Sequence, residues 1–471
     1  MATPEAAHGQ SARRPASVLL IAYEFPPSPS PQSLRWCYLA AGLARHGHRV
    51  HVLAPEHPGN GVGLPGLPEG VVVHRTFAGP GMGLLNLLVR RRRGGAVRER
   101  ARVDGAENAF AQDEGTPATV AMQRPLNWKG HVHNALSAFR TWLFHGLQRL
   151  MGPCFFPDGR AEWYPWARKG LDRVLSGHAI DIVISSHEPA TTLSLGLLAS
   201  RKGYPWIADL GDPVLAPYTP RRWRRRALRL ERDVCARADL VTVTTETVAR
   251  SLAQRHGLDG DRLLVLTQGF AASADSRPGP PPFGGDRPLE LLYTGSLYVF
   301  RSIGALVDAV EQTPGVRLNI ASIAVPDDVL AASLRSPSIR LLGFLPHAEA
   351  VEWQARCDVL INLANDDACQ IPGKFYEYLG AGRPILHIGD GLDPAAGLVR
   401  EIPRGWACAR DPAALARILR QLMVDARAGT LGAGLDLSPE AVADYEWAAI
   451  SGRLHDRMTD LIAEYRKNDG Q

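Results

Sequence analysis

The chain has 471 residues, of which 45% are hydrophobic and 21% charged, so wholesale disorder is excluded and two domains of ordinary size are expected. Lys and Arg number 53 against 48 Asp and Glu, and this net charge of +5 is smaller than a dedicated nucleic-acid binder usually carries. The six cysteines contain no C-x-x-C pair, which argues against a disulfide framework or a zinc site and favours a reducing compartment.

The opening sequence MATPEAAHGQSARRPA has no apolar core after its charges, so we expect no signal peptide. No stretch of about 18 apolar residues occurs, so no transmembrane helix is expected either. These patterns predict a cytoplasmic protein that is soluble or attached to the membrane surface.

Strands and helices alternate from the N-terminus onward. Residues 18–22 (VLLIA) are predicted as a buried parallel strand. A Pro- and Ser-rich loop follows, and apolar residues at helical spacing then predict a helix over 33–46 that ends at Gly47. With a second strand over 49–54, this unit is the opening of a doubly wound α/β sheet.

The alternation continues along most of the chain, although residues 79–157 fit it poorly and are interpreted as an insertion. In the first half we expect strands at 180–185, 206–209, 240–244 and 263–266, with helices at 190–201 and 222–237. In the second half we expect strands at 289–293, 317–321, 339–342, 359–363 and 384–388, and a final helix at 439–466.

The Pro- and Gly-rich segment 273–288 has no periodicity and is interpreted as a linker. We therefore divide the chain into a first domain (1–272), a second domain (289–436) and a C-terminal helix (437–471) that packs back toward the first domain. The predicted fold class is α/β, with two Rossmann-like doubly wound domains facing across a cleft. Ligands of such sheets bind beyond the carboxyl ends of the strands, so the loops after strands are the informative ones.

The segment IPGKFYEYLGAGRPIL (371–386) is the strongest candidate for a ligand site. Pro372 suits the start of a helix, and Gly373 allows a ligand close to the backbone. The free N–H groups of a helix start, with the charge of Lys374, suit a phosphate. Glu377 lies on the same helix face and can accept hydrogen bonds from two sugar hydroxyls. Together these groups would hold a nucleoside diphosphate, although a capped helix with a surface Lys–Glu pair explains the residues about equally well.

Three other loops after strands carry weaker signals. YTGSLYVFRS offers a tight turn at Gly295 and a charge at Arg301 for a second diphosphate contact, but an ordinary turn is the favoured explanation in isolation. His187 would project into the cleft, or it is merely solvated. Asp209 and Asp212 follow another strand; two carboxylates alone are a poor metal signature, so capping of the next turn is favoured.

Two runs are basic, RRRR at 90–93 and RRWRRRALR at 221–229. The second run lies on a predicted helix. A solvated helix face explains both runs, and attraction to an anionic membrane surface is the functional alternative.

The order of these motifs resembles the GT-B-fold glycosyltransferases of family 4 over nearly the whole chain. GKFYEYLGAGRPIL is the most specific part and is similar to a segment of many bacterial surface-polysaccharide glycosyltransferases, in which a Lys precedes the donor-binding Glu. HEP (187–189) is similar to a segment of phosphatidylinositol mannosyltransferases whose His faces the donor sugar. LTQGF (266–270) resembles the segment that ends the first domain.

The resemblance implies retaining transfer of a sugar from a nucleotide-diphosphate sugar to a glycan or lipid-linked acceptor, in cell-surface polysaccharide synthesis. It implies donor contacts from Gly295, Arg301, Pro372, Gly373, Lys374 and Glu377. The implied catalytic residues are His187, Lys374 and Glu377, with Lys374 at the diphosphate and Glu377 at the ribose. The residues expected on the acceptor side are Ser33, Arg35 and Asp212. No cofactor, metal or nucleic-acid partner is expected, and an anionic membrane surface is a further expected partner.

The chain departs from the family pattern at Gly211, where Arg is usual, and at Gln268, where Asn is frequent. Cys369 stands where many members have a glutamate that contacts the donor sugar, with Asp366 and Asp367 nearby. The donor sugar is therefore unassigned. Two alternatives stay open, a sugar-nucleotide epimerase of the same fold and a catalytically degenerate binding module. An NAD-dependent oxidoreductase is disfavoured because no G-x-G-x-x-G follows either first strand.

Overall fold

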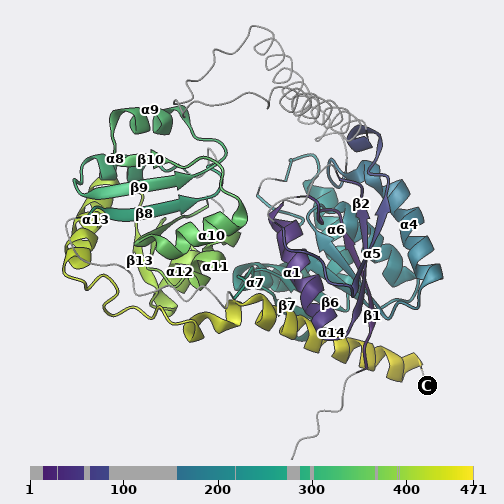
Figure 1. Cartoon of the computed structure of the whole chain (residues 1–471). Coiled ribbons are helices and arrows are strands. Elements are labelled where there is room, and N and C mark those ends of the chain that lie inside the picture. The colour runs from purple at the N-terminus through teal and green to yellow at the C-terminus, as the bar shows by residue number, and fades with distance from the viewer. Residues whose placement is uncertain are drawn as a thin grey trace, which may run out of the picture.

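The computed structural model describes residues 14–28, 30–57, 64–83, 156–217, 219–272, 287–297, 302–365, 370–389, 391 and 393–469. Most of the predicted insertion (84–155), with its RRRR run, and most of the predicted linker (273–286) lie outside the described residues. The described part forms two parallel α/β sheets with helices on their faces, joined along one side by the C-terminal helix (Figure 1).

The first sheet has seven strands within the described residues, all parallel, in the order β3-β2-β1-β4-β5-β6-β7. These strands are β1 (Ser17–Ala22), β2 (Arg49–Pro55), β3 (Val71–Thr76), β4 (Ile182–His187), β5 (Trp206–Leu210), β6 (Leu240–Val243) and β7 (Leu263–Val265). The described helices of this domain are α1 (Pro31–Arg45), α4 (Tyr164–Gly177), α5 (Thr191–Arg201), α6 (Arg224–Arg237) and α7 (Glu246–His256), with 3₁₀ turns η2 (Ala161–Trp163) and η3 (Gly260–Arg262). The strand order reverses between β1 and β4, which makes the loops after these two strands the place where a ligand is expected.

The second sheet repeats this arrangement. Its described strands run in the order β10-β9-β8-β11-β12-β13, again all parallel. They are β8 (Leu289–Thr294), β9 (Val316–Ala321), β10 (Ile339–Leu341), β11 (Val359–Leu363), β12 (Ile385–Ile388) and β13 (Gly405–Cys408). Its described helices are α8 (Gly304–Glu311), α9 (Asp327–Arg335), α10 (His347–Arg356), α11 (Gly373–Gly380), α12 (Pro394–Glu401) and α13 (Pro412–Arg427). Here the order reverses between β8 and β11.

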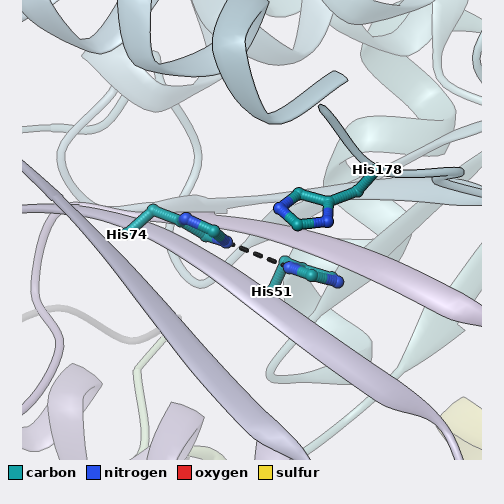
Figure 2. A group of neighbouring side chains, drawn as sticks. All are labelled: His51, His74 and His178. Carbon is teal, nitrogen blue, oxygen red and sulfur yellow. Dashed lines mark hydrogen bonds between the residues drawn. The ribbon is translucent and has the colours of Figure 1, made fainter. Parts of the chain in front are cut away.

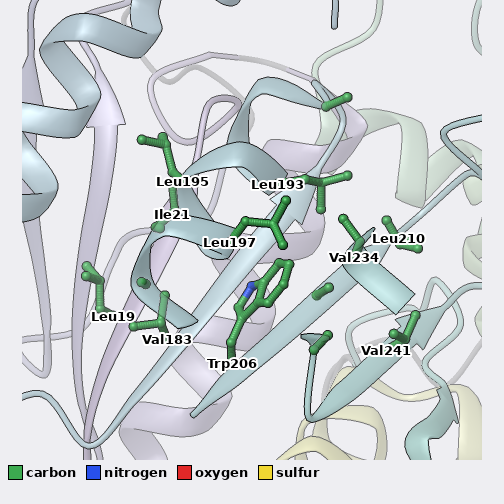
Figure 3. Packing of buried hydrophobic residues seen from close by; sticks show 14 of the residues in the cluster. Leu19, Ile21, Val183, Leu193, Leu195, Leu197, Trp206, Leu210, Val234 and Val241 are labelled. Atoms are coloured by element: carbon green, nitrogen blue, oxygen red, sulfur yellow. The ribbon is translucent and has the colours of Figure 1, made fainter. Parts of the chain in front are cut away.

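The core of the first domain explains why its strands are apolar runs. Leu19 and Ile21 of β1 face one helix layer, together with Val183 and Trp206 (Figure 3). The alternate residues Val18 and Leu20 face the opposite layer, so both faces of the strand are covered. The indole N–H of Trp206 donates to Ser185 Oγ at 2.9 Å, which satisfies the one polar group of this large buried ring.

The C-terminal helix packs against the first domain, as the sequence predicts (Figure 1). Its expected start is wrong, because a 3₁₀ turn, η4 (Glu440–Tyr445), and an extended residue, Glu446, precede α14 (Trp447–Asp469). Glu446 is extended because the chain pairs there with Phe270: the Phe270 N–H donates to Tyr445 O at 3.1 Å, and the Trp447 N–H donates to Phe270 O at 3.0 Å. No helix within the described ranges is long and apolar enough to span a bilayer.

Candidate functional site

Lys374 lies at the switch point of the second sheet. Its ammonium donates to the backbone oxygen of Thr294, the last residue of β8, at 2.9 Å, and stands 3.3 Å from the centre of the Tyr293 ring. Gly295 follows with a φ of +108°, and a Cβ there would lie 3.5 Å from Lys374 Cδ. The left-handed backbone and the side-chain contact both favour glycine, so the loop after β8 presents its backbone beside the lysine.

The start of α11 faces the first domain. Pro372 takes the N-cap position and Gly373 the first helical position, and no side chain of the described residues caps this end. A Cβ on Gly373 would lie 3.7 Å from Cγ of Gln268, a residue near the end of the first domain. Backbone N–H groups and a full positive charge therefore meet at one helix end that borders the other domain, an arrangement suited to a phosphate.

Glu377, one turn after Lys374, pairs with a histidine that the sequence analysis missed. The Glu377 Oε1 atom lies 3.1 Å from His347 Nε2, and the side chains are 22% and 34% exposed. The hydrogen bond to this carboxylate raises the pKa of His347 above its usual value, against the opposing effect of burial. His347 is the first residue of α10, directly after the loop that follows β10. Because ligands bind beyond the carboxyl ends of strands, this position could have identified His347 as a candidate from the sequence.

The charge of Glu377 also acts on a residue of the first domain. Burial raises the pKa of Tyr38, a residue of α1, and the negative charge of Glu377 raises it further. The predicted donor contact at Arg301 lies outside the described residues, as do Asp366, Asp367 and Cys369. Of the predicted donor set, the structure therefore brings together Gly295, Pro372, Gly373, Lys374 and Glu377.

A cavity of about 630 Å³ opens at the carboxyl end of the first sheet. The loops after β1, β4 and β5 and the start of α6 line it, so it lies at the switch point of this domain. Phe156, Pro189 and Trp223 give it apolar walls, and Arg160 and Glu188 add charge. Apolar rings with a few charges suit a partly polar organic ligand.

His187 is the last residue of β4 and lines this cavity. It is 6% exposed, and its Nδ1 atom has no hydrogen-bond partner among the described residues. Its backbone oxygen accepts from Gln32 Nε2 at 3.0 Å, which fixes the strand end to α1. A buried ring nitrogen without a partner is rare, because an unmet hydrogen bond costs free energy, and a ligand in the cavity would supply one.

Two residues expected on the acceptor side point into the protein instead. Arg35 is 0% exposed; it pairs with Asp209 at 3.1 Å and donates to Thr267 O at 2.7 Å. Ser33 is also buried, and neither residue lines the cavity. Arg35 thus holds the end of β5 to the segment after β7, because a buried carboxylate needs a compensating charge. Asp212, the third expected residue, is partly exposed beside cavity-lining Pro213.

Asp209 is accounted for by this buried network. Besides Arg35, it accepts from Thr242 Oγ1 at 2.7 Å and is 1% exposed. Its oxygens therefore face protein donors, so the sequence interpretation of Asp209 as a capping residue is wrong, and its role is that of a buried ion-pair partner.

The fold is similar to that of several solved structures. Sucrose-phosphate synthase from Thermosynechococcus elongatus is 16% identical, with a TM-score of 0.62, covering 95% of this chain and 100% of that chain. Anabaena Alr3699/HepE in complex with UDP-glucose is 13% identical, with a TM-score of 0.55, covering 94% and 100%. WaaG, a glycosyltransferase involved in lipopolysaccharide biosynthesis, is 12% identical, with a TM-score of 0.53, covering 93% and 98%. The predicted GT-B fold of two parallel-sheet domains is thereby confirmed.

At the level of sequence, residues 132–272 match the family described as Glycosyltransferase Family 4. The matched stretch includes β4 to β7, and with them His187 and Asp209, but ends before the second domain. No curated protein matches the chain.

Proposed function

We propose that the chain is a metal-independent, retaining glycosyltransferase of the hexosyltransferase type. It would move a sugar from a nucleotide-diphosphate sugar to a glycan or lipid-linked acceptor in cell-surface polysaccharide synthesis. The observation that carries the proposal is the meeting of Lys374, the Gly295 loop and the start of α11 at the second switch point. The match of 132–272 to Glycosyltransferase Family 4 and the UDP-glucose complex of a protein of the same fold support it.

The donor diphosphate would lie between the Gly295 loop and the N-terminus of α11. Breaking the bond from the sugar C1 to the diphosphate builds negative charge on the leaving phosphate. Lys374 and the helix N–H groups stabilise that charge without having to reorganise. The ribose hydroxyls would donate to Glu377, which in this structure pairs with His347. Donor binding would thus replace or share that contact.

Retention fits a displacement on the front face of the sugar. In that step the oxygen of the acceptor bonds to C1 as the bond from C1 to the phosphate breaks, and the leaving phosphate takes the acceptor's proton. The enzyme then needs neither a nucleophile nor a second carboxylate. His187 would hold a sugar hydroxyl or stabilise charge near C1, with its unpartnered Nδ1 as the contact atom.

The cavity of the first domain would receive the acceptor. Two arginines lie against aromatic rings that line it: Arg226 of α6 lies over the rings of Phe156 and Trp223, and Arg222, which precedes α6, lies over Trp223. Rings that line a cavity next to exposed cations suit an acceptor that carries a sugar and an anionic group. The same basic face is the part of the molecule that we propose attaches the enzyme to the inner face of a membrane.

A thermal-shift panel tests the donor site. UDP, GDP, ADP, CDP and dTDP would be added to the wild type, to Lys374→Ala and to Lys169→Ala, an exposed lysine of α4 that serves as the control. A nucleotide at about 100 times its Kd stabilises the fold by about 2.7 kcal/mol. We expect one nucleotide to raise the unfolding midpoint by a few degrees in the wild type and the control.

The same nucleotide should leave the midpoint of Lys374→Ala unchanged. If no nucleotide raises the wild-type midpoint, the donor site is not functional and the proposal fails. An equal rise in both lysine variants would place the nucleotide elsewhere. Conversion of the nucleotide sugar without an acceptor would favour the epimerase instead.

A further inference from the structure

Three histidines from distant parts of the sequence meet on the first domain, away from both switch points. His51 lies on β2, His74 on β3, and His178 directly follows α4. One ligand nitrogen from each ring lies within 4.8 Å of the other two. In Figure 2 the rings of His51 and His74 meet edge to edge, and the ring of His178 leans over His51. His51 Nδ1 and His74 Nε2 are 3.0 Å apart and share a hydrogen bond.

The fold explains why these rings converge. Leu53 of β2 pairs in register with His74 of β3, and His51 lies two positions before Leu53 on β2. Side chains two positions apart on a strand share a face, so His51 and His74 point to the same face of the sheet. Helix α4 covers that face, as Leu171 and Val174 show by packing with Leu53, and the helix ends at His178. The edge strand, its neighbour and one helix end therefore each contribute one imidazole.

The chemistry of the group is that of a metal-ligand set. Neutral imidazole is a common ligand of Zn²⁺, Cu²⁺ and Ni²⁺. Tetrahedral bonds of about 2.0–2.1 Å place ligand nitrogens about 3.3 Å apart, so small ring movements suffice from the present separations. Burial and the neighbouring histidines lower the pKa of His51 to about 4 and lower that of His74, so both rings are neutral at pH 7. The positive charge of Arg49 also acts on His51 and opposes a cation, but Arg49 is exposed to solvent, which screens it.

We propose that His51, His74 and His178 form a binding site for a late first-row divalent cation, with Zn²⁺ as the ion that fits best. His51 is buried, His74 is half-buried and His178 is exposed, so solvent reaches one side and can supply a fourth ligand. The ion would join β3, the edge strand of the sheet, to β2 and to the end of α4. Its role is structural or regulatory, because none of the three histidines lines the cavity of the first domain.

Metal titration of the full chain tests the site. The protein would be treated with EDTA, dialysed, and titrated with Zn²⁺ alone by calorimetry. The variants are His178→Ala and His74→Asn. The matched control is His46→Ala, because His46 is exposed and caps α1 as His178 caps α4. Co²⁺ would serve as a second probe, since its visible absorption reports a tetrahedral nitrogen site.

We expect the wild type and His46→Ala to bind Zn²⁺ with the same affinity. Each cluster variant should bind at least about a hundredfold more weakly, because loss of an outer-shell partner alone costs about 10- to 100-fold. The Co²⁺ bands should disappear with the same variants. Equal binding by His178→Ala, His74→Asn and the wild type, or equal loss in the control, would overturn the proposal. So would a wild type that binds no Zn²⁺ while its circular dichroism shows it to be folded. None of these results depends on sugar transfer.

Discussion

At the scale of single residues, Lys374 holds its charge in a defined place before any ligand arrives. Its ammonium is fixed by a backbone oxygen and an aromatic face, Thr294 O and the ring of Tyr293. A diphosphate that approaches the Gly295 loop therefore meets a positioned cation, which is the condition for electrostatic stabilisation of a leaving group.

This arrangement makes Lys374→Ala and Glu377→Ala sensitive variants. We expect each to lower the turnover of sugar transfer by at least about a hundredfold, the effect of losing one preorganised polar contact. Turnover would be measured with the nucleotide sugar whose nucleotide stabilises the wild type. The variants Lys169→Ala and Glu352→Ala, both at exposed positions outside the site, should keep wild-type turnover. Near-normal turnover in both site variants would mean that these residues are not at the donor.

Single residues also show which features of the site the sequence could not predict. The rule that ligands bind beyond the carboxyl ends of strands directs attention to His187 and Lys374. In the structure His187 lines a cavity, and Lys374 lies at the switch point of the second sheet. The rule cannot say which way a side chain turns, so Arg35 was expected at the acceptor but lies in a buried ion pair with Asp209. Nor can it pair Glu377 with His347, because thirty positions separate the two and only the second sheet brings them together.

At the scale of elements, the central strands are the predictable ones. Both faces of β1 and β11 are covered, so nearly every residue of these strands is buried and apolar. Such a continuous apolar run predicts a strand directly. Of the four edge strands of the described sheets, β7 and β10 were also predicted, whereas β3 (VVVHRT) and β13 (GWAC) were missed. Their residues are mostly only half-buried, which leaves room for His, Arg, Gly and Cys. The three-histidine cluster was missed for a related reason, since it needs the register of β3 as well as the end of α4.

Helix α6 contains most of the basic run at 221–229. Its first two turns expose arginines, while Ala227 and Val234 face the core. Such a helix presents one charged face to a surface. The basic run therefore forms an exposed, positively charged helix face. Charge reversal on this face tests whether it binds an anionic membrane surface.

We expect the double variant Arg225→Glu/Arg229→Glu to lose binding to anionic vesicles. Each basic residue near an anionic surface contributes about 1 kcal/mol, so two reversals should weaken binding by more than about tenfold. Co-sedimentation with phosphatidylserine-containing vesicles measures this. High salt should weaken wild-type binding, because exposed charges are screened. The control Arg417→Glu/Arg420→Glu reverses two exposed arginines of α13 on the second domain. Binding that is insensitive to salt, or lost equally in the control, would contradict membrane attachment through α6.

At the scale of the whole molecule, the chain's last helix belongs to its first domain. Trp447, Ile450 and Leu454 of α14 pack into the same cluster as Val18 and Leu20 of β1. The Tyr38 and Trp447 rings also stack, with 5.4 Å between their centres. The first domain is thus completed by residues that follow the second in sequence, so its core cannot be complete without the C-terminal segment.

A histidine contact also joins this helix to the first domain, next to Leu454. His48 Nδ1 accepts a hydrogen bond from the Ala16 N–H at 3.0 Å, so neutral His48 carries its proton on Nε2. That atom lies 2.7 Å from His455 Nδ1 on α14 and donates to it. Protonation of His48 would place a second N–H against the Ala16 N–H and break the bond. Burial, with the charges of His455 and His46, lowers the pKa of His48 to about 4.

This shift makes stability depend on pH with a definite sign. The unfolded chain takes up a proton at His48 near pH 6.5, but the folded chain only near pH 4, so the unfolded state binds more protons between these values. His51, whose folded pKa is also about 4, acts in the same direction. The stabilisation is complete above pH 6.5 and is lost as the pH falls toward 4. Each histidine contributes at most about 1.4 kcal/mol per pH unit to the slope of the unfolding free energy.

Denaturant unfolding measured at several pH values, with EDTA present to remove any metal, tests this prediction. In His48→Asn the Oδ1 atom can replace Nδ1 as acceptor of the Ala16 N–H, but the side chain does not titrate. We expect the variant to show a shallower fall in unfolding free energy between pH 6.5 and 4 than the wild type. The control is His46→Asn, at an exposed position of the same junction, which should keep most of the wild-type slope. A slope for His48→Asn equal to that of the wild type would mean that the contact between His48 and α14 does not govern acid stability.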